Sequence, residues 1–319
     1  MTGLAIGAGP NLRRSTTGKM NGKTFVVAVD GSKMSKRAVQ LAAWFHSEAS
    51  RDKMRFVCVT GSKMSGHQAL EHIKEAEQAA KMCGVRACHI IPGVALPVAD
   101  DAGTQGVVDA LCNEAHGGNL ILGAGGRECT IDESVSLQCM GKSRAPVILC
   151  KPKGTPMVDS VRGMTMRKDG RVGTTIVVTV DGGTISQKCF DMALRFVQPK
   201  DRVIALTIKN TDKSVTNANA VSNSLLGFSS IENYYKGECA KAAARFDRSE
   251  FSFVSLRLGR SGVANTILQY CETEDVLADM IIIGSVEMGK PKADSMLGSV
   301  AATVAKKAPC HVLVAKHFA

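Results

Sequence analysis

The chain has 319 residues and a formal net charge of +11, with 45% hydrophobic and 22% charged residues. At about 150 residues per domain this length predicts two domains. No stretch approaches the roughly 18 consecutive apolar residues that a membrane span needs, which excludes an integral membrane protein. The aromatic share of 4% argues against base-stacking platforms, so neither a membrane nor a nucleic acid is expected as a partner.

Two basic segments lie outside the apolar pattern. The first carries no acidic residue before Asp30, and glycine and proline interrupt any amphipathic helix in it, so a disordered tail is predicted over 1–21. The second contains Arg162 and Arg167 and is predicted to be a basic linker over 153–171. We interpret both as solvated segments, with contact to a nucleic acid or an acidic surface as the alternative.

The 11 cysteines are scattered and include no C-x-x-C pair. This spacing predicts neither a disulfide framework nor a zinc site, and it indicates a reducing compartment. Since the first residues also lack a secretory apolar segment, a cytoplasmic location is expected.

Short apolar strands alternate with amphipathic helices along the first half of the chain. Strands are expected over 25–29, 56–59, 85–91 and 119–123, with helices near 38–45, 67–82 and 108–115; a glycine-bearing loop, a last helix and a fifth strand follow. The second half repeats this order, with strands near 176–180, 203–208, 251–258 and 279–284. Strands that are apolar along their whole length predict a parallel sheet with helices on both faces.

Three segments recur in the same order, 151 to 163 residues apart. The recurring pairs are Asp30 with Asp181, Gly123 with Gly284, and Pro146 with Pro309. The chain is therefore predicted to be one domain written twice. The expected organisation is a tail over 1–21, a first domain over 22–152, a linker over 153–171 and a second domain over 172–319. A single continuous sheet is not expected.

Asp30 and Asp181 each end the first strand of a half, at the edge where parallel α/β sheets bind ligands. An Asp-Gly pair is also common in turns, and Asp30 could cap the next helix. The recurrence in both halves favours a carboxylate that accepts hydrogen bonds from a ligand.

A second candidate feature is the start of the last helix in each half. In the second half Gly298 and Ser299 open this helix, where backbone amides and the helix dipole favour a phosphate. Ser299 could equally be a simple cap. The corresponding pair in the first half is read as Val135 and Ser136, in which a valine replaces the glycine.

Other nucleotide and catalytic motifs are incomplete. The segment from Gly284 to Lys290 has P-loop spacing, but Pro291 replaces the hydroxyl residue that would bind magnesium. The seven histidines show no metalloprotease motif and no triad context.

The strand ending V-D-G-S at Ser32, with Ser35 three residues later, a fourth strand ending in glycine, a Gly-Ser helix start and an A-P-x-x-V-L segment together resemble the universal stress protein family. The resemblance covers 22–152 and 172–317, as a tandem form. It implies an α/β fold of two repeated five-stranded parallel sandwich domains, Rossmann-like and similar to adenine nucleotide alpha hydrolases. Members pair through the last strand, so a tandem chain would form an intramolecular pseudo-dimer.

Some members of the family bind ATP through G-x-x-G, nine residues and G-[S/T], and others lack the motif. The binding residues that the resemblance implies are Asp181, Ile208, Gly284, Gly298, Ser299 and Val300 in the second domain and Asp30, Gly123, Gly126 and Ser136 in the first. The pattern departs at Glu287, which stands where the second glycine should be, and at Val135. Gly61 is read as occupying the position of an apolar residue that flanks adenine.

The resulting hypothesis is a cytoplasmic stress-response or signalling protein that binds an adenine nucleotide, ATP alone or with Mg²⁺, best in the second domain. No general base can be named, so slow ATP hydrolysis is the most catalysis expected. The alternative is a structural or interaction protein with degenerate pockets that binds no nucleotide. An enzyme of the wider α/β group ranks last, because the S-G-G-x-D-S loop of ATP pyrophosphatases is absent.

Overall fold

The computed structural model describes residues 22–61, 64–124, 134–151, 173–209, 228–285 and 297–316. The predicted tail and linker lie outside these ranges, as do Gly126 and Glu287. We call residues 22–151 the first half and residues 173–316 the second half.

The first half alternates strands and helices as predicted. Its elements are β1 (Thr24–Ala28), α1 (Lys33–Phe45), β2 (Lys53–Thr60), α2 (Gly66–Met82), β3 (Ile90–Pro97), α3 (Gly103–Glu114), β4 (Asn119–Gly123), α4 (Val135–Lys142) and β5 (Val147–Cys150). Short 3₁₀ turns precede β3 and α3, at Ala87–His89 and Asp100–Ala102. Local chemistry sets the helix starts: Ser32 caps α1, and Ser65 and Gln68 form a capping box on α2.

One strand of the first half lies further along the chain than predicted. The apolar run at 85–91 is expected as the third strand, but β3 begins at Ile90 and extends to Pro97. Proline and glycine, here Pro92 and Gly93, are unfavourable inside a strand, but β3 lies at the edge of the sheet, where a proline need not donate to the ladder. The expectation over 85–91 is therefore wrong for its first five residues.

The second half has the same order of elements. They are β6 (Thr175–Thr179), α6 (Thr184–Phe196), β7 (Arg202–Lys209), α8 (Phe228–Arg245), β8 (Glu250–Arg257), α9 (Val263–Cys271), β9 (Met280–Gly284), α10 (Ser299–Lys307) and β10 (His311–Ala315). The predicted strands of this half agree with these bounds to within two residues.

All ten strands belong to one sheet in the order β3-β2-β1-β4-β5-β10-β9-β6-β7-β8. Pairing is parallel within each half and antiparallel only between β5 and β10, where Leu313 lies opposite Ile148. The expectation that the sheet would not be continuous is therefore wrong. The reason is that each half uses the free edge of its last strand to pair with the other half, while the strand order of each half stays intact.

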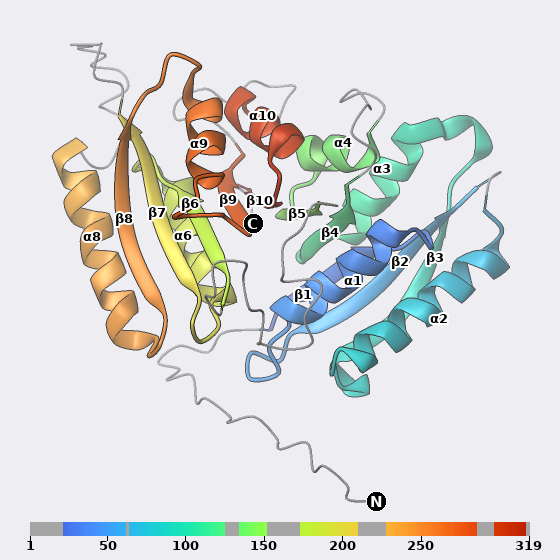
Figure 1. The fold of residues 1–319 in the computed structure, drawn as a ribbon. Coiled ribbons are helices and arrows are strands. Elements are labelled where there is room, and N and C mark those ends of the chain that lie inside the picture. The colour runs from blue at the N-terminus through green and yellow to red at the C-terminus, as the bar shows by residue number, and fades with distance from the viewer. Residues whose placement is uncertain are drawn as a thin grey trace, which may run out of the picture.

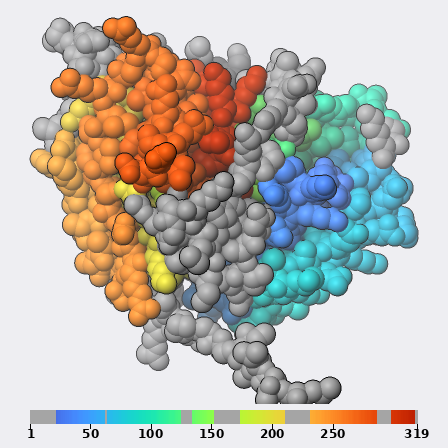
Figure 2. Space-filling model, viewed as in Figure 1, coloured from blue at the N-terminus to red at the C-terminus, as the bar shows by residue number. Residues whose placement is uncertain are grey.

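Two hydrophobic cores lie on the two faces of the sheet. One core lies under α1, α2, α6 and α8, and the other lies under α3, α4, α9 and α10 (Figure 1). Each core contains residues of both halves, and the space-filling view shows the halves as adjoining lobes, orange for the second and blue to cyan for the first (Figure 2). The α/β fold class predicted from the sequence is confirmed.

Aromatic residues join the halves on the α1 and α6 face. Phe45 and Phe196 end these helices at equivalent positions, and their ring centroids are 4.4 Å apart. Both side chains are almost fully buried. These two rings thus extend the apolar core on this face of the sheet across the contact between the halves.

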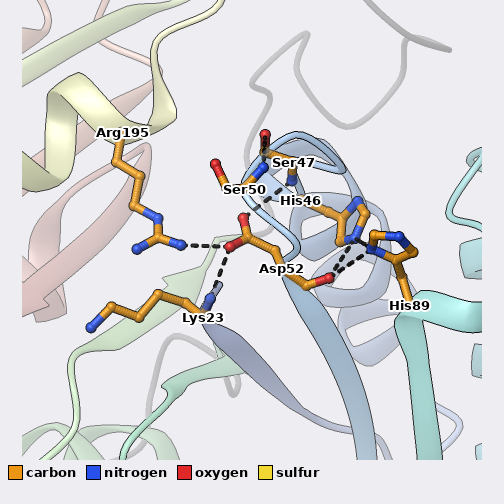
Figure 3. Close-up of polar contacts among 7 residues, drawn as sticks. All are labelled: Lys23, His46, Ser47, Ser50, Asp52, His89 and Arg195. Atoms are coloured by element: carbon orange, nitrogen blue, oxygen red, sulfur yellow. Dashed lines mark hydrogen bonds and ion pairs between the residues drawn. The ribbon is translucent and has the colours of Figure 1, made fainter. Parts of the chain in front are cut away.

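A buried ion pair also joins the halves. Asp52, 1% exposed, precedes β2, and one carboxylate oxygen lies 2.5 Å from a guanidinium nitrogen of Arg195 on α6 (Figure 3). The same carboxylate accepts the backbone N–H groups of Lys23 and Ser47 at 2.9 and 3.2 Å. A charge this deeply buried needs such partners, and here the strongest one comes from the other half.

Asp201, the equivalent of Asp52 before β7, is held within its own half. Its carboxylate accepts the backbone N–H groups of Thr174 and Gln198 at 2.8 and 2.7 Å. Burial raises the pKa of Asp201 to about 6, although these hydrogen bonds act to lower it.

We call the junction of β5 and β10 the seam, and one lysine from each half reaches across it to the last helix of the other half. Lys151 follows β5, and its ammonium donates to the carbonyl of Lys306 at 3.1 Å, in the last turn of α10. Lys316 follows β10 and donates to the carbonyl of Met140, near the end of α4. Cations at helix carboxyl ends are favourable, but burial lowers the pKa of each lysine to about 8.

Candidate functional site

The two predicted aspartates lie in matching turns between the first strand and the first helix of each half. The backbone N–H of Ser32 donates to Asp30 Oδ1 at 3.0 Å, and that of Gly183 donates to Asp181 Oδ1 at 2.9 Å. Gly31 and Gly182 follow with φ of 76° and 83°, a conformation that favours glycine. The turn interpretation of the Asp-Gly pair is therefore correct at both places.

Both carboxylates nevertheless remain exposed at the edge of the sheet. At Asp181 the backbone N–H of Gly183 and the hydroxyl of Ser186 both donate to Oδ1, and at Asp30 the backbone N–H of Ser32 donates to Oδ1. Burial acts to raise the pKa of Asp30, but hydrogen bonds from Ser32 and Ser35 outweigh it and hold the pKa below the ordinary value. A carboxylate that is ionised and fixed in place by its own turn is suited to accept a ligand's hydroxyl or amino group.

Sequence analysis missed the role of one serine in this turn. Ser186 donates its hydroxyl to Asp181 Oδ1, and the same Oγ accepts the backbone N–H of Asp181 at 2.9 Å. Ser35 is its equivalent in the first half, and its hydroxyl donates to the carbonyl of Ser32 at 2.9 Å. The recurrence of a serine five residues after each aspartate is the pattern that could have identified it.

The second long helix of each half also contributes a side chain near this turn. A Cβ placed on Gly31 would lie 2.3 Å from Cε1 of His72 on α2, so the imidazole packs on the turn. Tyr234, at the corresponding position of α8, donates to Oε1 of Gln187 on α6 at 2.5 Å. Neither residue has a recognisable motif around it, and sequence analysis did not select them.

Gly123 and Gly284 end β4 and β9, and close packing against a neighbouring helix explains why both positions are glycine. A Cβ on Gly123 would lie 2.8 Å from Met34 Cβ, and one on Gly284 would lie 2.6 Å from Ile185 Cγ2. The first turns of α1 and α6 therefore approach these strand ends too closely for a side chain.

In the second half, the start of α10 is held at the end of β9. The backbone N–H of Gly298 donates to the carbonyl of Ser285 at 2.5 Å, and Ser285 in turn donates to the carbonyl of Ala315 at 2.9 Å. Ser299 is exposed and Val300 is half-buried. The fold thus brings Gly284, Gly298, Ser299 and Val300 to one edge of the sheet, as the sequence predicts.

The N-cap of α10 is a glycine, whereas the N-cap of α4 is a serine. Gly298 has no side chain that could accept from the first amides of α10, but Ser134 Oγ accepts the N–H of Leu137 at 3.4 Å. Ser136 is buried, with its Oγ 3.1 Å from that of Ser134. The N-cap residue of α10 therefore supplies no side-chain hydrogen bond to the first turn, and the dipole of a helix start favours an anionic ligand.

The strand register also changes which residues of the first half are equivalent to those predicted in the second half. Gly123 pairs with Cys150 and Gly284 with Ala315, so Lys151 and Lys316 are equivalent. Ser134 and Ser299 both stand 17 residues before these lysines. Ser134, and not the Ser136 chosen from the sequence, is thus the counterpart of Ser299, and Glu133 replaces the glycine.

A similar shift applies at the second strand. Ala28 pairs with Val57 and Thr179 with Leu206, which makes Val59 the counterpart of Ile208. Both are half-buried and pack against the same core. Gly61 lies beyond the end of β2, in a bridge with Met64, so its assignment to the adenine-flanking position is wrong.

Two general features of the described residues bear on the class of site. They contain no cluster of three or more His, Cys, Asp or Glu side chains that could hold a metal ion. No helix among them has the length and apolar character to span a membrane.

Comparisons with known proteins concern the family and the fold. Residues 174–316 match the model of the universal stress protein family. No curated protein matches the sequence.

Two solved structures cover both halves of the chain. The chain is similar to a universal stress protein from Archaeoglobus fulgidus, at 16% identity and a TM-score of 0.57 over 93% of this chain and 97% of that one. It is also similar to a putative universal stress protein from Pseudomonas aeruginosa, at 14% identity and a TM-score of 0.54 over 93% and 94%. At these identities the likeness shows a shared fold. The family model thus covers residues 174–316, and the solved structures show the same fold over both halves of the chain.

Proposed function

We propose that the second domain binds an adenine nucleotide, ATP, at the carboxyl edge of β6, β7 and β9. The observation that carries this proposal is the start of α10, which a glycine leaves without a side-chain cap and which the Gly298–Ser285 hydrogen bond holds beside β9. Such a helix start presents backbone amides and a favourable dipole to phosphate oxygens.

Each residue of this edge has a distinct role in the proposal. The free oxygen of the exposed Asp181 carboxylate accepts hydroxyl groups of the ribose, while Oδ1 stays fixed by Gly183 and Ser186. Ile208 supplies an apolar surface for the base. Gly284, Ser299 and the amide of Val300 face the phosphates, with the Ser299 hydroxyl as an added donor.

The first domain is proposed to bind nucleotide weakly or not at all. Asp30, Gly123 and Val59 repeat the second-domain residues, but Ser134 occupies the first amides of α4 with its own hydroxyl. Glu133 also precedes that serine, and an anionic side chain at this place repels a phosphate.

We further propose that the protein acts in the cytoplasm by binding, with the two domains as an internal pair joined at β5 and β10. No described residue of the edge is placed as a general base for hydrolysis, and Mg²⁺ would have to be held mainly by the nucleotide.

Isothermal titration of the full chain with ATP tests this proposal. We expect one site per chain, and Asp181→Asn should weaken binding by roughly tenfold to a hundredfold, because it removes a hydrogen bond to a charged group. Asp30→Asn is the matched control and should leave the affinity unchanged. Loss of binding in Asp30→Asn but not in Asp181→Asn would place the site in the first domain and overturn the proposal.

The second candidate function is a structural or interaction protein without a nucleotide. Glu287 favours it, because a carboxylate replaces the glycine of the family's motif in the second domain. Glu287→Gly should tighten ATP binding about tenfold if the pocket is only impaired. Absence of binding heat in both the wild type and Glu287→Gly, together with absence of co-purified nucleotide, would establish this second function instead.

A further inference from the structure

Two histidines of the first half lie against one backbone carbonyl. His46 follows α1, and His89 lies in the 3₁₀ turn before β3. His46 Nε2 is 3.0 Å and His89 Nδ1 is 2.9 Å from the carbonyl oxygen of Asp52 (Figure 3). The two ring nitrogens are 3.1 Å from each other. Each of these three atoms can offer an electron pair, and together they form a nearly equilateral triangle.

Protons alone cannot make all three of these contacts favourable. The carbonyl oxygen only accepts, and each ring nitrogen either carries a proton and donates or lacks one and accepts. If both nitrogens carry a proton, the contact between His46 and His89 joins two donors. If one of them lacks a proton, its contact with the oxygen of Asp52 joins two acceptors. At least one contact is therefore unfavourable in every protonation state, and a cation bound to all three electron pairs would remove this conflict.

The second half uses the equivalent carbonyl in a different way. By strand register Glu250 corresponds to His89, and its backbone N–H donates to the carbonyl of Asp201 at 2.8 Å. The backbone N–H of His89 instead closes the 3₁₀ turn, and its imidazole contacts the carbonyl of Asp52. A valine, Val197, stands after α6 at the position of the other histidine. The triangle of donor atoms is thus particular to the first half.

The surrounding structure holds the three donor atoms in place. The carboxylate of Asp52 is fixed by Arg195 and by two backbone amides, so its carbonyl cannot turn away without disturbing a buried ion pair. The two imidazole rings pack edge to face, with their centroids 5.0 Å apart. His89 is 8% exposed, whereas His46 is only half-buried, so solvent reaches one of the two rings. The atoms are therefore preorganised, and one side of the group is open to a small ion.

We propose that His46 Nε2, His89 Nδ1 and the carbonyl oxygen of Asp52 form a binding site for a divalent transition metal ion of the Zn²⁺ type. Imidazole nitrogens are preferred ligands of such ions. In a tetrahedral site, ligands at about 2.0 to 2.1 Å from zinc lie about 3.3 to 3.4 Å apart, so the three contacts need to lengthen by only a few tenths of an ångström. Binding moves the ring protons to His46 Nδ1 and His89 Nε2, and water supplies the fourth ligand. Because the site uses two side chains and a main-chain atom, it differs from the clusters of three or more side chains that the described residues lack.

Isothermal titration with Zn²⁺ tests this proposal on the full-length protein, after a chelator has removed bound metal and while a phosphine keeps the cysteines reduced. We expect Zn²⁺ to bind, and His46→Gln and His89→Gln should each weaken binding by at least the roughly tenfold to hundredfold that loss of a ligand's supporting residue costs. His116→Gln changes an exposed histidine, is the matched control and should leave the affinity unchanged. Mg²⁺ should not compete, because it prefers oxygen ligands.

A second measurement uses the wild type and does not depend on whether the variants fold. Diethyl pyrocarbonate modifies neutral imidazoles, and Zn²⁺ should protect His46 from it while His116 stays reactive, as peptide mass spectrometry can show. Cys88→Ser should leave zinc binding unchanged, although Cys88 is exposed and adjacent to His89. The proposal is overturned if the wild type binds no Zn²⁺, if neither histidine variant weakens binding, if Cys88→Ser abolishes it, or if Zn²⁺ fails to protect His46.

Discussion

The two halves bury equivalent aspartates in different ways. Asp201 is held by two backbone amides of its own half, whereas Asp52 also receives the guanidinium of Arg195 from the other half. The first helix of the first half has Trp44 at the position of Arg195, so the ion pair is not repeated. The comparison teaches that the apolar cores and the lysines after β5 and β10 are repeated in both halves, while this ion pair and the capping of the last helix are not.

The largest expected effect comes from removing the cation of this pair. Arg195→Met leaves Asp52 buried with only amide donors, and we expect a loss of about 3 kcal/mol in the free energy of unfolding. Urea denaturation measures it. Arg202→Met, which removes an exposed contact to the carbonyl of Asp275, is the control and should cost less than about 0.5 kcal/mol.

The double variant Arg195→Met, Asp52→Asn sharpens this test. It removes both charges and should recover part of the loss. Equal costs for Arg195→Met and Arg202→Met would mean that Asp52 and Asp201 are stabilised alike, and the contrast between the domains would fail.

A smaller effect is expected from the two seam lysines, and here the domains should behave alike. The pKa of Lys151 and Lys316 is about 8 in the folded chain, against an ordinary value of 10.5. Between these values the unfolded chain binds more protons, so stability should rise as the pH increases from 8 to 10. Relative to Lys151→Met or Lys316→Met, the wild type should gain about 2 kcal/mol over this range.

Denaturation series at several pH values provide the measurement for both lysine variants. Parallel pH curves for the wild type and a variant would show that the lysine holds its ordinary pKa. If only one of the two variants loses the pH dependence of stability, the two lysines have different pKa values although their hydrogen bonds match.

The smallest effect concerns the two last helices. Ser134→Ala removes the N-cap acceptor of α4, and we expect a loss of about 1 kcal/mol in the free energy of unfolding. Gly298→Ala at the matching end of α10 removes no such bond. Thermal unfolding of both variants checks the difference. A loss for Gly298→Ala as large as that for Ser134→Ala would contradict the contrast between a capped and an uncapped helix.

Much of the fold could be predicted because apolar strands and helix spacing repeat twice along the chain. The exception is β3, which contains Pro92 and Gly93. These residues are unfavourable in a central strand and are tolerated here because β3 lies at the edge of the sheet. The periodicity of apolar residues indicates which side chains are buried, but it does not indicate which strand lies at the edge of the sheet.

The candidate site could be predicted in outline only. The repeat located Asp30, Asp181, Gly284 and the start of α10, but counting residues across loops of unequal length misplaced two first-domain residues. Ser134 and Val59 could be identified as the counterparts of Ser299 and Ile208 only from the register of the strands. Arg195 and Asp52 are 143 positions apart, so no local pattern could have paired them.

The antiparallel pairing of β5 with β10 has a consequence for how substitutions act at the contact between the halves. In a symmetric assembly of two identical chains, any substitution appears on both sides of the contact at once. Here the two sides are encoded separately, so Arg195 and Trp44 can differ although they occupy equivalent positions in the two halves. Covalent fusion thereby frees one copy to specialise while the other preserves the shared architecture.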